Sequence, residues 1–104
     1  MEIKILWSDL ALSQLEDIFD YHKTVASVSV ARKLVKSIIE TTLKLEVNPL
    51  LGVKEPLLAD RPFEYRFLVQ KNYKIIYRFN ESIVWVIAVF DTRQNPEKLA
   101  RISG

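Results

Sequence analysis

The sequence predicts an α+β fold of the order β-α-α-β-β-β, contained in a single domain that spans residues 1–104. Three observations lead to this prediction. A short alternating segment opens the chain, two segments with apolar residues at helical spacing follow, and three segments with period-two alternation come after Pro62. A chain of 104 residues buries one modest core, so one domain is the expected number.

The N-terminal strand is predicted from Glu2 to Trp7, where Ile3 and Ile5 alternate with the neighbouring residues. Ser8 follows directly, and a serine is a favourable N-cap for the helix that is predicted to begin there. The apolar side of this first helix is one stripe, formed by Ala11, Leu15, Ile18, Phe19 and His22. The helix is predicted to end near residue 24, where β-branched residues and serines begin.

A second helix is predicted from Ser27 or Ser29 to Val47, because apolar residues recur there at helical spacing. Its stripe consists of Ala31, Leu34, Val35, Ile38, Thr42 and Leu45. The pair Asn48-Pro49 ends the helix, since the residue before a proline is pushed out of the helical region. So short a connection between two helices predicts an antiparallel helical hairpin.

Residues 48–62 are predicted to form the one long loop of the chain, because three prolines and Gly52 punctuate them. The same segment carries large apolar side chains, namely Leu50, Leu51, Val53, Leu57 and Leu58. A free linker would be more polar, so this loop is expected to lie against the core rather than to separate two domains.

Three strands are predicted after Pro62, at residues 63–69, 73–79 and 83–90, with connections at 70–72 and 80–82. Such short connections predict an antiparallel meander. The last strand is apolar on both alternating sets of residues, so it is predicted to be central and covered on both faces. The N-terminal strand is expected to join this sheet, and the helical hairpin is expected to cover one face and leave the other partly open. Pro96 is expected to open a short helix through Leu99.

The C-terminal part of the chain is basic, although the whole chain carries a net charge of only +2. Residues 1–60 hold seven Lys/Arg against nine Asp/Glu, whereas residues 61–104 hold eight against four. The basic excess favours an anionic partner for the C-terminal part, either nucleic acid or an acidic protein segment.

The residue inventory excludes several kinds of site. The chain has no cysteine, so it forms no disulfide and no thiolate metal site. One histidine and scattered carboxylates give no metal-ligand spacing, and two glycines cannot make a glycine-rich phosphate loop, so no metal and no other cofactor is expected. The apolar runs are shorter than the roughly 20 residues of a membrane span. The N-terminus lacks a signal-peptide pattern, so a cytoplasmic protein without membrane contact is expected.

Four local features follow one another along the chain. They are the strand-to-helix start with Ser8, Leu12, Leu15, Ile18 and Tyr21; Pro49-Leu50-Leu51-Gly52; Tyr65-Arg66 followed by Tyr73-Lys74-Ile75-Ile76-Tyr77; and Val89-Phe90-Asp91-Thr92-Arg93-Gln94-Asn95-Pro96. In this order the features resemble the RelE/ParE superfamily of bacterial toxins from type II toxin–antitoxin systems, which includes plasmid stabilisation proteins. The resemblance covers essentially the whole chain.

The resemblance implies a toxin that is neutralised by a cognate antitoxin and forms a hetero-oligomer with it. The antitoxin of such a pair wraps a flexible segment around the toxin and folds on it. Members of the superfamily act in two ways. ParE-like members bind DNA gyrase and trap it, whereas RelE-like members cut mRNA in the ribosome. A relative that binds its antitoxin without being toxic is a third possibility.

An RNA-cleaving site needs cations that stabilise the charged phosphorane, together with an acid and a base. Arg66, Arg78 and Arg93 are the candidate catalytic cations of a nuclease, and the resemblance places Arg66 and Arg93 near the RelE-like active centre. Lys71, Lys74 and Arg93 are the candidates for binding a phosphate or another target group. All of these residues fall in or next to the predicted strands, in the basic part of the chain.

The acid and the base are what the sequence lacks. Asp91 stands where many relatives carry a histidine, and no tyrosine follows Tyr77. The only histidine, His22, lies on the first helix and is interpreted as a helix-end or core-edge residue. The tyrosines of the predicted strands and both tryptophans are interpreted as packing residues, and Arg93 as a possible partner of Asp91. These departures favour the ParE-like, gyrase-directed branch, with the ribosome-dependent mRNA endonuclease as the alternative.

Overall fold

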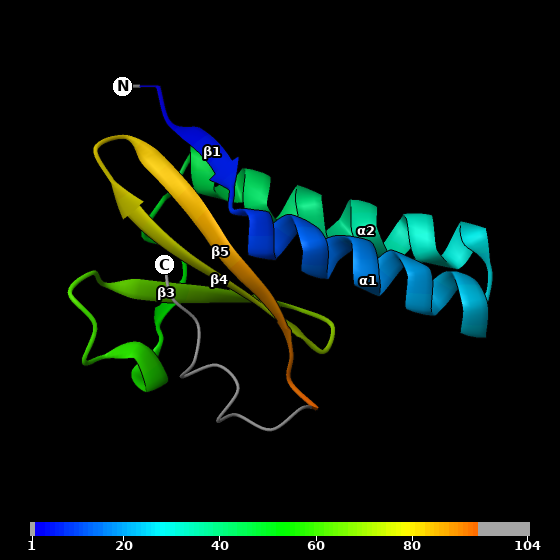
Figure 1. Cartoon of the computed structure of the whole chain (residues 1–104). Helices are drawn as coiled ribbons and strands as arrows, with labels where there is room; N and C mark the ends of the chain where they lie inside the picture. The colour runs from blue at the N-terminus through cyan, green and yellow to red at the C-terminus, as the bar shows by residue number, and fades with distance from the viewer. Residues whose placement is uncertain (1, 94–104) are drawn as a thin grey trace.

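The computed structural model describes residues 2–93 as a five-stranded sheet with a helical hairpin on one face (Figure 1). The elements are β1 (Lys4–Trp7), α1 (Asp9–Val25), α2 (Val28–Leu43), the 3₁₀ turn η1 (Lys44–Glu46), β2 (Val53–Lys54), the 3₁₀ turn η2 (Pro56–Leu58), β3 (Tyr65–Gln70), β4 (Tyr73–Asn80) and β5 (Ile83–Asp91). The predicted α+β order is confirmed, with β2 as an additional strand. The helix predicted from Pro96 lies outside the described residues.

The strand order of the sheet is β1-β5-β4-β3-β2. The predicted meander is confirmed, because β3 pairs antiparallel with β4 and β4 with β5. β1 joins the sheet as expected and pairs parallel with β5, which makes the sheet mixed. The β4–β5 turn has positive φ at both Glu81 and Ser82, as a two-residue hairpin turn that matches strand twist requires. β5 is an interior strand and is buried along most of its length, whereas β4 holds the middle of the order.

The faces of β5 differ from the prediction because a β-bulge interrupts its pairing with β4. Ile76 pairs with Ala88 but Tyr77 pairs with Val86, so Ile87 is the extra residue. Strict alternation would put Ile87 and Ala88 on opposite faces, whereas both pack into one cluster on the face away from the helices. The helical face of β5 therefore carries Val84, Val86 and Val89, and the other face carries Trp85, Ile87, Ala88 and Phe90.

Both helices begin at serine caps. The Ser8 hydroxyl accepts a hydrogen bond from the Ala11 N–H and donates one to the Ile87 carbonyl, which ties the start of α1 to β5. Ser27 caps α2 in the same way, by accepting from the N–H of residue 30. The apolar stripes of the hairpin pack on the sheet through Ala11, Ile18, Leu34 and Ile38, as the periodicity predicted.

Residues 48–62 lie against the sheet as predicted, but they are not one irregular loop. Two residues of this segment form β2, which pairs with β3 at the edge of the sheet. Gly52, Glu55 and Leu58 are buried. The other large apolar residues of the segment, Leu50, Leu51, Val53 and Leu57, are 44% to 64% exposed. Val53 belongs to β2, and a strand at the edge of a sheet has a neighbouring strand on one side only, so its side chains are less covered. None of the described helices is long and apolar enough to cross a membrane.

Candidate functional site

The predicted cationic residues do not form one cluster in the structure. Arg66 pairs with Tyr77 across β3 and β4, so its side chain lies on the same face as that buried ring. Lys74 and Arg78 occupy the alternate positions of β4 and project from the opposite face. Lys71 lies in the exposed β3–β4 turn with a φ of 54°. The sheet therefore places Arg66 on one face and Lys74 and Arg78 on the other.

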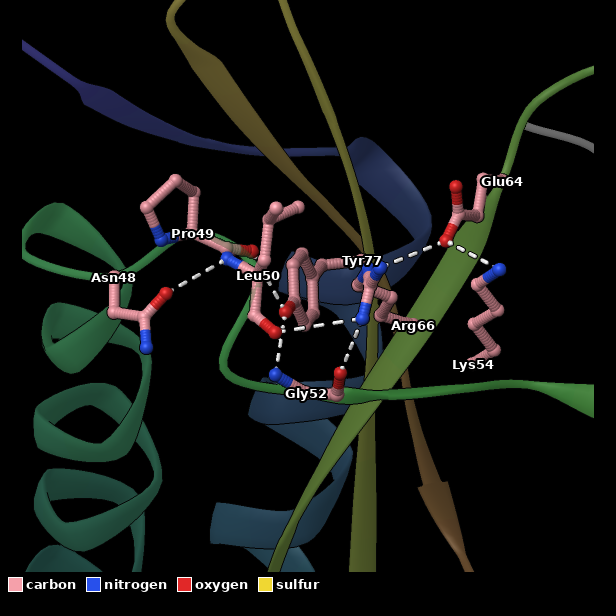
Figure 2. Close-up of polar contacts among 8 residues, drawn as sticks. All are labelled: Asn48, Pro49, Leu50, Gly52, Lys54, Glu64, Arg66 and Tyr77. Carbon is pink, nitrogen blue, oxygen red and sulfur yellow. Dashed lines mark hydrogen bonds and ion pairs between the residues drawn. The ribbon is translucent and has the colours of Figure 1, made fainter.

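Arg66 fastens the loop that precedes β2 (Figure 2). Its Nη1 donates a hydrogen bond to the Gly52 carbonyl at 2.8 Å, and its Nη2 donates to Glu64 Oε1 at 2.8 Å. Lys54 reaches the same carboxylate at 3.6 Å. The Arg66 side chain is only 18% exposed. The guanidinium N–H groups thus donate to a backbone carbonyl and to the Glu64 carboxylate, so few of them are free to bind a phosphate.

Tyr77 holds the same loop from the interior. Its hydroxyl accepts a hydrogen bond from the Gly52 N–H at 2.8 Å and donates one to the Pro49 carbonyl at 2.9 Å. The ring is fully buried, and burial raises the pKa of its phenol. Together Arg66 and Tyr77 satisfy both backbone groups of Gly52 (Figure 2). The packing interpretation of Tyr77 therefore agrees with its place in the structure.

Lys74 is paired with a buried acid. Its Nζ lies 2.9 Å from Glu55 Oε2 and 4.2 Å from the centre of the Phe67 ring. Glu55 is 2% exposed, and its other oxygen accepts a hydrogen bond from the Leu57 N–H. A buried carboxylate needs such a counter-charge, because an unpaired one is costly to desolvate. Lys74 thus fixes the turn η2 to the sheet, and its charge is already neutralised.

Arg93 pairs with Asp91 at the end of β5. Its Nε and Nη2 lie 3.0 and 2.8 Å from the two carboxylate oxygens, and its backbone N–H also donates to Asp91. These hydrogen bonds hold the pKa of Asp91 at about 2, below the ordinary value of 3.8. Asp91 is therefore ionised at neutral pH and carries no proton to give to a leaving group. Arg93 itself remains 63% exposed.

Two groups that can transfer a proton lie next to this ion pair, and no local sequence pattern indicates that they meet. His22 Nε2 lies 3.0 Å from the Tyr73 hydroxyl, although the two residues are 51 positions apart. Tyr73 is 4% exposed, and burial together with the nearby Asp91 raises the pKa of its phenol. Tyr73, Asp91 and Arg93 line a concavity of about 520 Å³ between α1 and β5, with Gln14, Asp17, Ile18, Tyr21, Val89 and Phe90. This concavity brings Arg93 near Tyr73, whose hydroxyl contacts His22, so a predicted cation lies close to two groups that can transfer a proton.

Large apolar side chains lie exposed on the outer side of α2 and just beyond it. Ile39 and Leu43 are one helical turn apart and are 38% and 47% exposed, and Val47 follows at 89%. Exposed apolar side chains that recur along one helix are typical of a protein–protein contact. Within residues 2–93, no group of three or more His, Cys, Asp or Glu side chains could hold a metal ion.

Comparisons with known proteins agree with the fold and with the resemblance seen in the sequence. The family model described as "ParE toxin of type II toxin-antitoxin system, parDE" matches residues 5–96. The solved structure titled "Chromosomal ParDE TA system from P. aeruginosa" superposes with a TM-score of 0.73 at 18% sequence identity, covering 86% of this chain and 96% of that one. At that identity the likeness establishes the fold alone. No curated protein matches the chain.

Proposed function

Because this chain belongs to the ParE toxin family of type II toxin–antitoxin systems, we propose that it acts in the cytoplasm by binding DNA gyrase, without catalysing a reaction of its own. The observation that carries the proposal is the local pairing of three of the five predicted cations. Arg66 is bound to Gly52 and Glu64, Lys74 to Glu55, and Arg93 to Asp91.

This pairing bears on the mechanism because RNA cleavage needs several cations that converge on one phosphate. Arg66 lies on one face of the sheet and Lys74 on the other, so the two cannot contact the same phosphate. Asp91 is held ionised by Arg93 and accepts hydrogen bonds only. A protein that binds its target needs none of this convergence, so the arrangement supports the non-catalytic branch.

The cognate antitoxin is the second partner that we propose. The exposed apolar residues Ile39, Leu43 and Val47 offer a surface that an amphipathic segment of the antitoxin would cover. Burying this apolar area would contribute a favourable free energy of roughly 25 cal/mol per Å². That contribution would offset the entropy lost when a flexible segment folds on binding. The toxin and the antitoxin would then form a hetero-oligomer.

One observation favours the alternative, a ribosome-dependent mRNA endonuclease. Tyr73, hydrogen-bonded to His22, lies in the concavity that also contains Arg93. A phenol and an imidazole could move a proton there, with Arg93 as the cation beside them. Tyr73 would have to lose or share its hydrogen bond to His22 in order to reach a substrate.

Two assays on the purified protein separate these functions. The proposal expects inhibition of DNA supercoiling by gyrase, and it expects Tyr73→Phe to inhibit as well as the unchanged protein does. The alternative expects new cleavage ends on ribosome-bound mRNA, mapped by primer extension, and their loss in Tyr73→Phe. Normal supercoiling at saturating toxin would overturn the gyrase proposal. Neither effect, with normal growth on strong induction, would mark a non-toxic relative that binds its antitoxin.

A further inference from the structure

Arg78 differs from Arg66, Lys74 and Arg93 because it has no acidic partner among the described residues. It makes no hydrogen bond and no ion pair within residues 2–93, and its Nε is buried without a partner. The side chain is partly buried, and its two Nη atoms are not among the buried atoms that lack a partner. These terminal nitrogens are therefore not fully buried, and they have no hydrogen-bond partner among the described residues.

Two aromatic rings hold the Arg78 guanidinium in place. Its Cζ lies 4.3 Å from the centre of the Phe63 ring and 5.9 Å from that of Trp85. Contacts of this kind fix the planar group and shield its faces from water, but they satisfy none of its N–H donors. The guanidinium is therefore partly desolvated and already oriented by the two rings in the absence of a ligand. Such pre-organisation lowers the ordering cost of binding an anion.

The surroundings indicate which anion would fit. A nucleic acid contacts several cations at once, since its phosphates follow one another along the strand. Lys74, the other cation projecting from this face of β4, is already neutralised by Glu55. Among the described residues on this face of β4, Arg78 is therefore the cation without a counter-charge, and its neighbours include the ring of Phe63, which is 42% exposed. This combination matches one carboxylate carried by an otherwise apolar peptide segment, whose two oxygens suit the fork of an arginine.

We propose that Arg78 is a binding site for an Asp or Glu side chain of a protein partner, presented by a segment whose neighbouring side chains are apolar. The site lies on the sheet face opposite the helical hairpin, so it is separate from the apolar surface of α2. The proposal deepens the proposed function by naming chemistry that a protein partner must present. Its test uses neither gyrase nor an antitoxin, so the two proposals can fail separately.

The test follows side-chain NMR signals of the ¹⁵N-labelled protein during titration with defined probes. The probes are the capped peptide Leu-Glu-Leu, its counterpart Leu-Gln-Leu, and a ten-residue oligothymidylate. The readouts are the Nε–H signal of Arg78, assigned by its loss in Arg78→Lys, and the indole N–H signal of the adjacent Trp85. We expect the Glu peptide to shift both signals in the millimolar range, and at about tenfold lower concentration than the Gln peptide.

Two variants complete the test. Arg78→Lys keeps the charge but loses the planar fork, so the Trp85 signal should need about tenfold more Glu peptide to shift. Lys33→Gln, on the exposed side of α2, removes one charge elsewhere and should leave the titration unchanged. Equal responses to the Glu and Gln peptides, or no response to either, would overturn the proposal. A stronger response to the oligonucleotide would overturn it too and would assign the site to nucleic acid phosphate.

Discussion

Replacing Tyr77 with phenylalanine tests whether the loop before β2 is held by the tyrosine hydroxyl. The substitution keeps the buried ring and removes one oxygen. The Gly52 N–H, whose bond to that oxygen is buried, would then have no partner, and the Pro49 carbonyl would lose its donor. An unsatisfied buried donor costs about 1–3 kcal/mol. Because the Pro49 carbonyl is only partly buried and can turn to water, we expect a total loss of about 2 kcal/mol.

Unfolding in urea, followed by tryptophan fluorescence, measures this loss. Trp7 and Trp85 both pack against the core clusters, so their emission reports on the whole sheet. In a thermal unfolding experiment with the same fluorescence signal, a loss of about 2 kcal/mol should lower the melting temperature by roughly 10 °C in a domain of this size. Tyr21→Phe is the matched control, since that side chain is 56% exposed, and it should stay within about 0.5 kcal/mol of the unchanged protein. A loss below about 0.5 kcal/mol for Tyr77→Phe would refute the reasoning.

A second substitution at the same contact makes the test stricter. A Cβ on Gly52 would lie 2.7 Å from the Phe67 carbonyl oxygen and from two atoms of Tyr77. Glycine is required here by close approach and not by φ, because no glycine described has a positive φ. Gly52→Ala should therefore cost about 1–3 kcal/mol. In the Tyr77→Phe background it should cost at least about 0.5 kcal/mol less, since part of the contact is already gone. Additive losses would mean that the two residues do not share this contact.

Three further predictions concern the ion pairs and the cap of α1. Lys74→Met leaves the Glu55 carboxylate buried without its cation and should cost about 3 kcal/mol in urea unfolding, and adding Glu55→Gln should recover most of that loss. Ser8→Ala removes both the N-cap and the bond to β5 and should cost about 1–2 kcal/mol by the same measurement. The pKa of Asp91 is lowered on folding, from 3.8 to about 2, so this residue adds stability that is complete above its ordinary pKa and is lost as the pH falls toward 2. Asp91→Asn should therefore flatten the decline of the urea midpoint over that pH range, and an unchanged decline would contradict the assignment.

The sequence predicts those elements whose signals are local. The Ser8 cap and the apolar stripes each depend on residues within a few positions of one another. The end of α2 is predicted at Val47, whereas the α-helix ends at Leu43 and continues as the 3₁₀ turn η1 to Glu46. The contacts that define the candidate site are not local. Glu55 and Lys74 are 19 positions apart, and no pattern within either segment indicates that they pair. β2 is two residues long and exists only because β3 lies beside it, so period-two alternation has too little length to reveal it.

The separation of Arg66 from Lys74 and Arg78 depends on the length of the β3–β4 turn. A three-residue connection at 70–72, as the sequence suggested, pairs residue 69 with residue 73 and therefore puts Arg66 opposite Ile76. Arg66 would then share a face with Lys74 and Arg78. The actual connection is two residues long, Gln70 pairs with Tyr73, and Arg66 lies opposite Tyr77. A shift of one residue moves a side chain to the other face of a sheet. Period-two alternation alone does not determine this register, because it does not give the number of residues in the turn.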